Sequence, residues 1–294
     1  MCEISVVLPV YNGENHIGEA IESVLSQTFR DFELIIINDC STDDTAEIIK
    51  RYGQQDKRIR IINNSQNKKL PVSLNIGFQK ARGKYLTWTS HDNCYKPEAF
   101  AQMHAALEKE PEYGLVYADY SIIDRAGTLI RKNPMKEPDA IYSANVVGAC
   151  FLYRKTVADQ VGKYDTDMFL AEDYDYWIRI YQHAKLKHLP QNLYLYRCHA
   201  DSLSATKLED IKMQTVKLWF KHFDFISTGL HDYKKRWVFY DTIINYAPPE
   251  KRSRIIKYFI QNNFMYCIHV CKNAILHQYH AKVLREKNAK NNCL

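Results

Sequence analysis

The stretch Gly83-Lys84-Tyr85-Leu86-Thr87-Trp88-Thr89-Ser90-His91-Asp92-Asn93 decides how the rest of the chain is interpreted. From Tyr85 to Thr89 it is apolar and aromatic, which is typical of a buried strand because such side chains pack well on a pleated sheet. The strand then ends in Ser-His-Asp-Asn. The carboxylate of Asp92 is a hard oxygen ligand of the kind that Mg²⁺ or Mn²⁺ binds. Taken alone, the stretch fits a ligand site and an ordinary polar turn equally well.

The same pattern, an apolar strand with a polar end, occurs elsewhere in the first half of the chain. Further strands are predicted over 4–10, 32–38, 60–63 and 114–118, and apolar residues at helical spacing separate them. This alternation predicts an α/β fold with a mostly parallel central sheet covered on both faces. Tyr11 and Asn12 follow the first strand, and Asp39 follows the second. Because the carboxyl ends of parallel strands meet at one edge of the sheet, a ligand site is expected there.

Past residue 120 the pattern changes. Asp124-Arg125-Ala126-Gly127 predicts a hairpin turn. A strand is predicted over 146–153, in which Gly148 would let a ligand approach the backbone closely. An edge strand over 193–197 leads to His199.

Two adjacent carboxylates, Glu172 and Asp173, stand at the start of a predicted amphipathic helix. The helix dipole favours anions at that position, so the pair is also typical of an ordinary helix start. On this evidence alone, a structural and a functional role both stay open.

The charge of the chain is unevenly distributed. Residues 207–294 contain 16 Lys and Arg against 7 Asp and Glu, whereas residues 1–206 contain 24 against 27. Aromatic and apolar residues at helical spacing predict helices in this basic segment, interrupted at Pro248-Pro249. The segment fits contact with an anionic membrane surface. It fits equally well packing on the preceding domain or on another subunit of a homo-oligomer.

Several classes of protein are disfavoured. No apolar run reaches about 18 residues, so no transmembrane helix is expected, and the first residues lack the features of a signal peptide. The 8 Cys form no CxxC pair, and Cys267, His269 and Cys271 are spaced so that a helix would not direct them to one metal ion. We expect a cytoplasmic protein with reduced cysteines and no nucleic-acid partner.

Taken together, six segments resemble family 2 glycosyltransferases, which have the Rossmann-like, nucleotide-sugar-binding fold called GT-A. In chain order they are Val7-Leu8-Pro9-Val10-Tyr11-Asn12, Ile37-Asn38-Asp39-Cys40-Ser41-Thr42-Asp43, Leu74-Asn75-Ile76-Gly77, Ser90-His91-Asp92-Asn93, Ala171-Glu172-Asp173-Tyr174-Asp175 and Tyr196-Arg197-Cys198-His199. The resemblance covers roughly residues 3–206. It implies a GT-A catalytic domain over residues 1–206, followed by a helical C-terminal extension over residues 207–294.

The resemblance implies an inverting enzyme of bacterial polysaccharide, lipopolysaccharide or cell-wall synthesis. Such an enzyme transfers a hexosyl or N-acetylhexosaminyl group from a nucleotide-diphosphate sugar, most often UDP-linked. The acceptor would be a hydroxyl of a glycan or of a lipid-linked glycan at the inner face of the cytoplasmic membrane, where the enzyme could bind peripherally.

The resemblance also assigns roles to residues. Asp173 would be the general base, with Glu172 as the alternative. Asp92 would bind Mn²⁺ or Mg²⁺, and His199 would contact that metal or the diphosphate. Arg197 is expected to be structural. The residues expected to contact the donor are Pro9, Tyr11, Asn12, Glu14, Asp39, Asn75, His91, Asp92, Gly148 and His199.

One departure from the family pattern bears on function. Many members carry two or three acidic residues where this chain has Asp92 alone, and His91 is expected to contact ribose or phosphate in place of a missing acid. The departure leaves open an inactive sugar-nucleotide-binding scaffold, although a protein that only binds has no need of Asp173. A nucleotidyltransferase is less favoured, because Tyr11-Asn12-Gly13-Glu14-Asn15 is not a glycine-rich phosphate loop. A dinucleotide-dependent oxidoreductase lacks its glycine motif for the same reason.

Overall fold

The computed structural model describes residues 2–200, 202–230 and 233–246. The chain divides into two compact units, Met1–Leu218 and Trp219–Leu294. The expected catalytic domain, residues 1–206, lies inside the first unit. The predicted helix break at Pro248-Pro249 and the segment from Cys267 to Cys271 lie outside the described residues.

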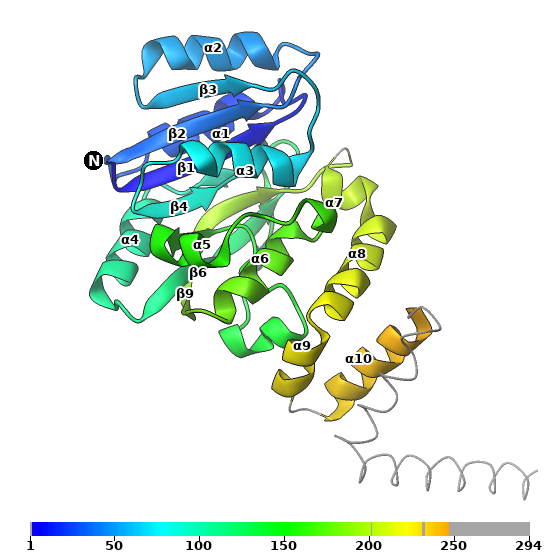
Figure 1. The fold of residues 1–294 in the computed structure, drawn as a ribbon. Coiled ribbons are helices and arrows are strands. Elements are labelled where there is room, and N and C mark those ends of the chain that lie inside the picture. The colour runs from blue at the N-terminus through cyan, green and yellow to red at the C-terminus, as the bar shows by residue number, and fades with distance from the viewer. Residues whose placement is uncertain (1, 201, 231–232, 247–294) are drawn as a thin grey trace, which may run out of the picture. The chain divides into compact units, whose positions relative to one another are not determined.

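The first unit alternates strands and helices along most of its length (Figure 1). Its strands are β1 (Ile4–Val10), β2 (Phe32–Asn38), β3 (Ile59–Asn63), β4 (Tyr85–Trp88), β5 (Cys94–Tyr95), β6 (Tyr113–Ile123), β7 (Leu129–Asn133), β8 (Phe151–Arg154) and β9 (Lys185–Arg197). Its α-helices are α1 (Ile17–Leu25), α2 (Thr45–Gln55), α3 (Leu70–Lys80), α4 (Ala99–Lys109), α5 (Lys155–Val161), α6 (Glu172–Tyr181) and α7 (Leu203–Thr206), and α8 (Leu208–Lys221) begins in it. Two short 3₁₀ helices are η1 (Pro138–Tyr142) and η2 (Thr166–Met168).

The strands form one sheet in the order β3-β2-β1-β4-β8-β6-β9-β5, with β7 paired to β6. Strands β1, β2, β3, β4, β6 and β9 run in one direction, and β5, β7 and β8 run in the other. The predicted α/β fold with a mostly parallel central sheet is therefore confirmed. The carboxyl ends of β1, β2 and β4 lie next to one another, because β1 pairs with both of the others.

The second half of the sheet differs from the predicted strands in detail. The strand predicted over 146–153 begins at Phe151, and the residues before it form turns, with Gly148 at a φ of +63°. Strand β6 continues past Asp119 to Ile123, because it pairs with β9 along its length and shifts register around Asp119. The hairpin turn at 124–127 is confirmed. Asp124 accepts the N–H groups of Ala126 and Thr128 on its carboxylate.

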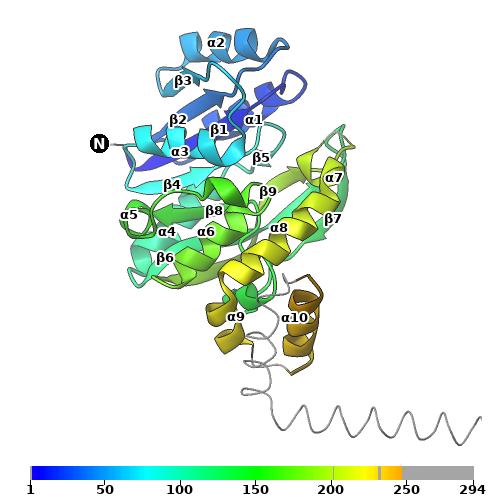
Figure 2. The same cartoon turned by 45° about the vertical axis from the view of Figure 1, so that its right-hand side comes forward.

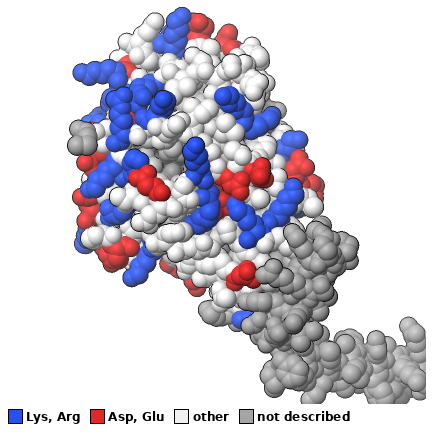
Figure 3. All heavy atoms as spheres, in the orientation of Figure 1, with Lys and Arg blue, Asp and Glu red and all other residues white. Residues whose placement is uncertain are grey.

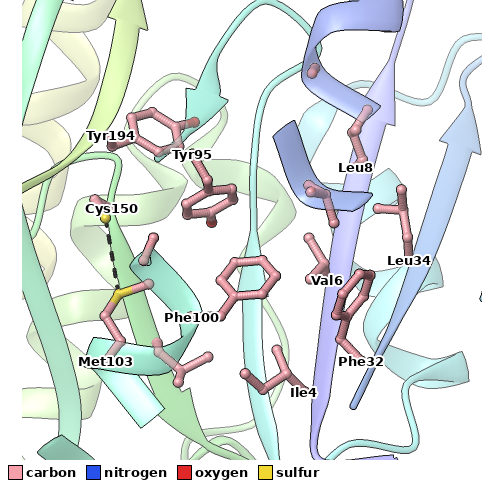
Figure 4. Packing of buried hydrophobic residues seen from close by; sticks show 14 of the residues in the cluster. Ile4, Val6, Leu8, Phe32, Leu34, Tyr95, Phe100, Met103, Cys150 and Tyr194 are labelled. Atoms are coloured by element: carbon pink, nitrogen blue, oxygen red, sulfur yellow. Dashed lines mark hydrogen bonds between the residues drawn. The ribbon is translucent and has the colours of Figure 1, made fainter. Parts of the chain in front are cut away.

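Helices cover both faces of the sheet, α1 and α4 on one and α3, α5 and α6 on the other (Figures 1 and 2). Side chains of β1 alternate between these faces, as strand geometry requires. Figure 4 shows one face of the core, in which Ile4 and Val6 of β1 lie near Phe100 of α4, and Leu8 lies farther along the same strand. Val7 points to the other face, where it meets Gly77 of α3.

The second unit is helical where the structure describes it, with α9 (Phe223–Gly229) and α10 (Tyr233–Tyr246). Aromatic rings join the two helices, since Phe223 stacks on Phe239 with ring centroids 6.0 Å apart. This confirms helices in the predicted extension. Among the described helices none has the length and apolar character needed to cross a bilayer.

Lys and Arg side chains are interspersed with Asp and Glu over the described residues on the face shown in Figure 3. That face therefore carries mixed charge.

Gly77 provides a test of the packing between α3 and β1. A Cβ atom at Gly77 would lie 2.4 Å from Val7 Cγ1, so we expect Gly77→Ala to lower the free energy of unfolding by about 1–3 kcal/mol. This would reverse the gain of about 1 kcal/mol that alanine normally gives inside a helix. Urea denaturation measures the change.

Gly18 of α1 is a matched control, because the nearest atom to its added Cβ would be Tyr52 Oη at 3.3 Å. Gly18→Ala should be close to neutral or stabilising. Equal effects of the two substitutions would contradict the proposed close packing at Gly77.

Candidate active site

A pocket of about 400 Å³ opens at the carboxyl ends of β1, β2 and β4. Seven of the predicted donor-contacting residues line it, namely Pro9, Tyr11, Asn12, Asp39, His91, Asp92 and His199. Further lining comes from the loop before α3, from Arg125 in the hairpin turn, from Phe169 and from α7. The fold thus brings together side chains that are up to 197 residues apart in the sequence.

The loops after β1 and β2 are held together by hydrogen bonds. Asn12, at a φ of +51°, accepts the N–H of Thr42 on Oδ1 at 2.9 Å. The N–H of Gly13 donates to Thr45 Oγ1 at 2.8 Å. Glu14 accepts the N–H of Asp44 at 3.0 Å, so its carboxylate stabilises the start of α2 and lines a separate hollow between α1 and α2. The structure thus places Glu14 outside the pocket.

Asp39 is 4% exposed, and its carboxylate fixes the loop that precedes α3. It accepts hydrogen bonds from Asn64 Nδ2 at 2.7 Å and from the N–H groups of Lys68 and Lys69, each at 2.9 Å. Since a carboxylate has about four acceptor positions, Asp39 retains little capacity for a ligand. It shapes the pocket wall in which Lys69, not singled out from the sequence, also lies.

His91 packs directly on the backbone of Gly13. A Cβ atom at Gly13 would come within 2.6 Å of Val10 Cγ2 and 2.7 Å of His91 Cδ2, so only glycine fits there while both side chains keep their positions. Burial lowers the pKa of His91, and the neighbouring charge of Asp92 opposes this shift only in part. The ring is therefore neutral at physiological pH and can both donate and accept a hydrogen bond.

Asp92 and His199 form a pair at the pocket. Asp92 Oδ2 lies 3.2 Å from His199 Nε2, and both side chains are mostly buried. Asp92 Oδ1 is buried and accepts no hydrogen bond from any residue that the structure describes. A buried carboxylate oxygen without a donor is costly, so this atom is suited to bind a cation or a ligand donor.

The pair fits a divalent cation as a partial set of ligands. Within the described parts of the chain, no group of three or more His, Cys, Asp and Glu side chains is arranged to hold a metal ion. Mg²⁺ commonly uses one or two protein ligands and takes the rest from substrate phosphates and water. The imidazole and the unpartnered Asp92 oxygen would supply such a pair.

His16, which was not singled out from the sequence, also lines the pocket. Its ring centroid lies 5.8 Å from that of His199, and its Nδ1 is buried without a partner among the described residues. Burial lowers the pKa of His16, and the charge of Arg197 lowers it further. A titratable side chain just ahead of the first apolar residue of α1 was the available signal.

The two carboxylates at the start of α6 have different surroundings. Asp173 is partly exposed, and its oxygens accept hydrogen bonds from the Tyr174 N–H at 2.7 Å and from Asn145 Nδ2 at 2.8 Å. Glu172 is only 4% exposed and accepts the N–H of Leu170 at 2.6 Å. Leu170 has a φ of +78°, a conformation that is unusual for leucine. Glu172 thus stabilises the turn that follows Phe169, which lines the pocket.

Burial raises the pKa of both carboxyl groups, and the charge of Asp173 raises that of Glu172 further. Neither group lines the pocket itself. Burial raises the pKa of Tyr196, the hydrogen bond with Ser204 opposes this shift, and the charges of Asp92 and Asp173 add to it.

Two further predicted residues lie outside the pocket lining. Asn75 uses both ends of its amide on the backbone of Tyr164, each at 2.9 Å. Gly148 packs against other side chains, since an added Cβ would lie 2.8 Å from Met135 Cε and 3.0 Å from Tyr120 Cε1. Both positions have a structural reason for their residue type, and their contact with a donor stays a prediction.

Arg197 has the structural role expected of it. Its guanidinium donates to the backbone oxygens of Asp92 at 3.0 Å and Arg125 at 2.8 Å, and it pairs with Glu19 of α1. It therefore fixes the backbone around Asp92 without contributing a side-chain ligand to the pocket.

Comparison with known proteins agrees with this fold. The family model described as glycosyl transferase family 2 matches residues 5–162. An uncharacterized glycosyltransferase from Rickettsia prowazekii is 29% identical over 223 residues, which cover 71% of this chain and 68% of that protein. Several other relatives are longer, and the match spans 23–37% of their length.

Two solved structures have a similar fold. Staphylococcus aureus TarS, residues 1–349 in complex with UDP-GlcNAc, aligns with a TM-score of 0.64 and 17% identity, over 88% of this chain and 81% of that one. The mannosyltransferase PcManGT from Pyrobaculum calidifontis, in complex with GDP-Man and Mn²⁺, aligns with a TM-score of 0.60 and 12% identity, over 89% and 80%. At these identities the likeness concerns the fold alone. Together with the family match, it establishes that this chain belongs to glycosyl transferase family 2 and has the GT-A fold.

Proposed function

We propose that this chain transfers a sugar from a nucleotide-diphosphate sugar to a hydroxyl of a glycan or lipid-linked acceptor, with inversion at the anomeric carbon. The observation that carries the proposal is the buried, unpartnered Asp92 Oδ1 beside His199, in a pocket at the carboxyl ends of β1, β2 and β4. We favour a UDP-linked hexosyl or N-acetylhexosaminyl donor. TarS was solved with UDP-GlcNAc and PcManGT with GDP-Man, so a GDP-linked donor is the alternative to test.

The donor would lie across the loops that follow the parallel strands. Pro9, Tyr11 and Asn12 would contact the base and ribose on one side, on a wall that Asp39 fixes. The neutral His91 would hydrogen-bond ribose or phosphate. The cationic side chains of Lys69 and Arg125 line the same pocket and favour a negatively charged ligand there.

Asp92 and His199 would hold a Mn²⁺ or Mg²⁺ ion. When bound, such an ion neutralises the negative charge that develops on the leaving nucleoside diphosphate. Without a metal ion, His199 would still contribute, because its Nε2 lies at the pocket beside Asp92 and can donate a hydrogen bond to a phosphate oxygen.

Asp173 is the side chain suited to act as general base. As the acceptor oxygen bonds to the anomeric carbon, the bond from that carbon to the diphosphate oxygen breaks, and the acceptor proton passes to Asp173. Attack from the face opposite the leaving group inverts the configuration. Asp173 is partly exposed, whereas Glu172 is buried and its carboxylate already accepts a hydrogen bond from the N–H of Leu170. Partial burial raises the pKa of Asp173 and makes it a stronger base, and the rate should rise with pH as this group loses its proton.

An inactive sugar-nucleotide-binding scaffold would share the pocket but would not release nucleotide. Contact with a membrane and the formation of a homo-oligomer stay predictions, as does the identity of the acceptor.

The first prediction concerns donor and metal. Wild-type protein incubated with a panel of UDP- and GDP-sugars should release nucleoside diphosphate from one donor, and faster with Mn²⁺ than with a chelator. Asp92→Ala should abolish metal-dependent binding of UDP, measured by calorimetry, because it removes the carboxylate next to His199.

Asp159→Ala is a matched control, since Asp159 of α5 is exposed and pairs with Lys155 outside the pocket. Unchanged metal-dependent binding in Asp92→Ala would remove this residue from the metal site. No nucleotide release with any donor would favour the scaffold.

The second prediction separates the two carboxylates of α6. Asp173→Asn should lower the rate of transfer by about 10²–10⁴-fold and leave UDP binding nearly unchanged, because it removes only the base. Glu172→Gln should lower the rate by less than about tenfold, since the amide oxygen can still accept the Leu170 N–H. Initial rates and UDP titrations of both variants give the comparison. The assignment is wrong if Asp173→Asn transfers sugar at the wild-type rate or if Glu172→Gln is the inactive variant.

A further inference from the structure

Asn145 makes a directed contact with Asp173. Its Nδ2 donates to Asp173 Oδ2 at 2.8 Å, and its Oδ1 accepts the N–H of Gly148 at 3.3 Å. The bond to Gly148 decides which end of the amide is which, because a backbone N–H can only donate. The NH₂ group therefore faces the carboxylate.

Asn145 belongs to the segment between β7 and β8, residues 134–150, which is anchored to the sheet and to α6. The N–H of Met135 donates to Asp119 Oδ1 of β6 at 2.7 Å, and Met135 packs against Gly148. Tyr174 of α6 donates its hydroxyl to the backbone oxygen of Ile141 at 2.6 Å. These contacts fix both sides of the Asn145–Asp173 hydrogen bond, so the amide is held in place for the carboxylate.

We propose that Asn145 is a positioning residue for sugar transfer, which holds Asp173 in one rotamer and stabilises its ionised form through the hydrogen bond to Oδ2. This inference rests on the proposed role of Asp173 as base. The other carboxylate oxygen is held by the Tyr174 N–H, which belongs to the same helix. Asn145 is thus a donor from a separate segment, and it fixes the carboxylate relative to the turns that precede β8.

Other titratable groups around Asp173 are Glu172 on its own helix, Tyr120 on β6, Tyr196 on β9 and Tyr164 before η2. Burial raises the pKa of each of the three tyrosines, so they stay neutral over the range in which a carboxylate titrates. A change in the titration of Asp173 can then be separated from theirs, and Glu172 is the neighbour to account for.

Two substitutions at Asn145 distinguish an electrostatic role from a purely structural one. Asn145→Asp keeps the shape of the side chain and an oxygen for the Gly148 N–H, but it replaces the donor to Asp173 by an acceptor. Asn145→Ala removes the side chain. If Asn145 only supported the loop, the isosteric aspartate would be the milder change. If it stabilises the Asp173 anion, aspartate would be the more severe one, because it adds a second negative charge.

The experiment is a carboxyl ¹³C NMR titration of the full chain, in which the Asp173 signal is assigned by its absence in Asp173→Asn. The pKa of Asp173 should rise by about one unit in Asn145→Ala, because the variant removes a hydrogen bond that stabilises the charged form. It should rise further in Asn145→Asp. The acid limb of the transfer rate should move by the same amount, a loss of about tenfold at low pH that is recovered at high pH, with an unchanged KM for the donor.

Ser143→Ala serves as the control, because Ser143 donates to Ala140 within the same segment and does not contact Asp173. Its titration should match the wild type. Unchanged pKa values of Asp173 in both Asn145 variants, or a smaller shift in aspartate than in alanine, would overturn the inference. The titration needs no substrate, so its result tests the role of Asn145 independently of the proposed function. The proposed function fails if Asp173→Asn stays fully active.

Discussion

The buried guanidinium of Arg197 is the interaction on which the pocket depends. Only 2% of this residue is exposed, and a buried arginine is stable only if its five N–H groups find acceptors. The guanidinium donates to backbone oxygens of the loop after β4 and of the hairpin turn, and to Glu19 of α1. The backbone N–H of Arg197 donates to Asn93 Oδ1 at 2.8 Å. Three segments, namely the loop after β4, the hairpin turn and α1, are thus tied to the end of β9. The backbone geometry of Asp92 follows from this arrangement.

The acidic residues around the site differ in how far their hydrogen-bonding capacity is already used. Asp39 accepts three internal donors and acts mainly on the shape of the pocket wall. Asp92 keeps one oxygen without a donor and Asp173 has one donor on each oxygen. A carboxylate that the protein has already satisfied costs little to bury, whereas an unsatisfied one gains most from a ligand. The number of acceptor positions still free on a carboxylate therefore indicates whether it supports the fold or can bind a ligand.

The first half of the fold could be predicted because the sequence patterns that indicate it are local. Apolar strands, helical periodicity and polar strand ends can each be recognised within a few residues. Strand topology also predicted that Asp39 and Asp92 lie near each other, and the family resemblance added His199; all three line the same pocket. The prediction could not anticipate Asn145 or His16, whose significance comes from Asp173 and His199, 28 and 183 residues away. Nor could it tell that Glu14 and Asn75 are already bound to backbone groups of their neighbours, because such pairing depends on tertiary contacts.

The contact between Gly13 and His91 also restricts how the chain can have evolved. The two residues are 78 positions apart, yet the imidazole occupies the space that a side chain at position 13 would need. A larger residue at 13 meets this ring at 2.7 Å and also Val10 Cγ2 at 2.6 Å, so both neighbours must change or move before it fits. Among homologues, the pair should therefore vary together. Loss of the ring at position 91 is therefore necessary but not sufficient for replacing glycine at position 13, because the side chain of Val10 must also give way.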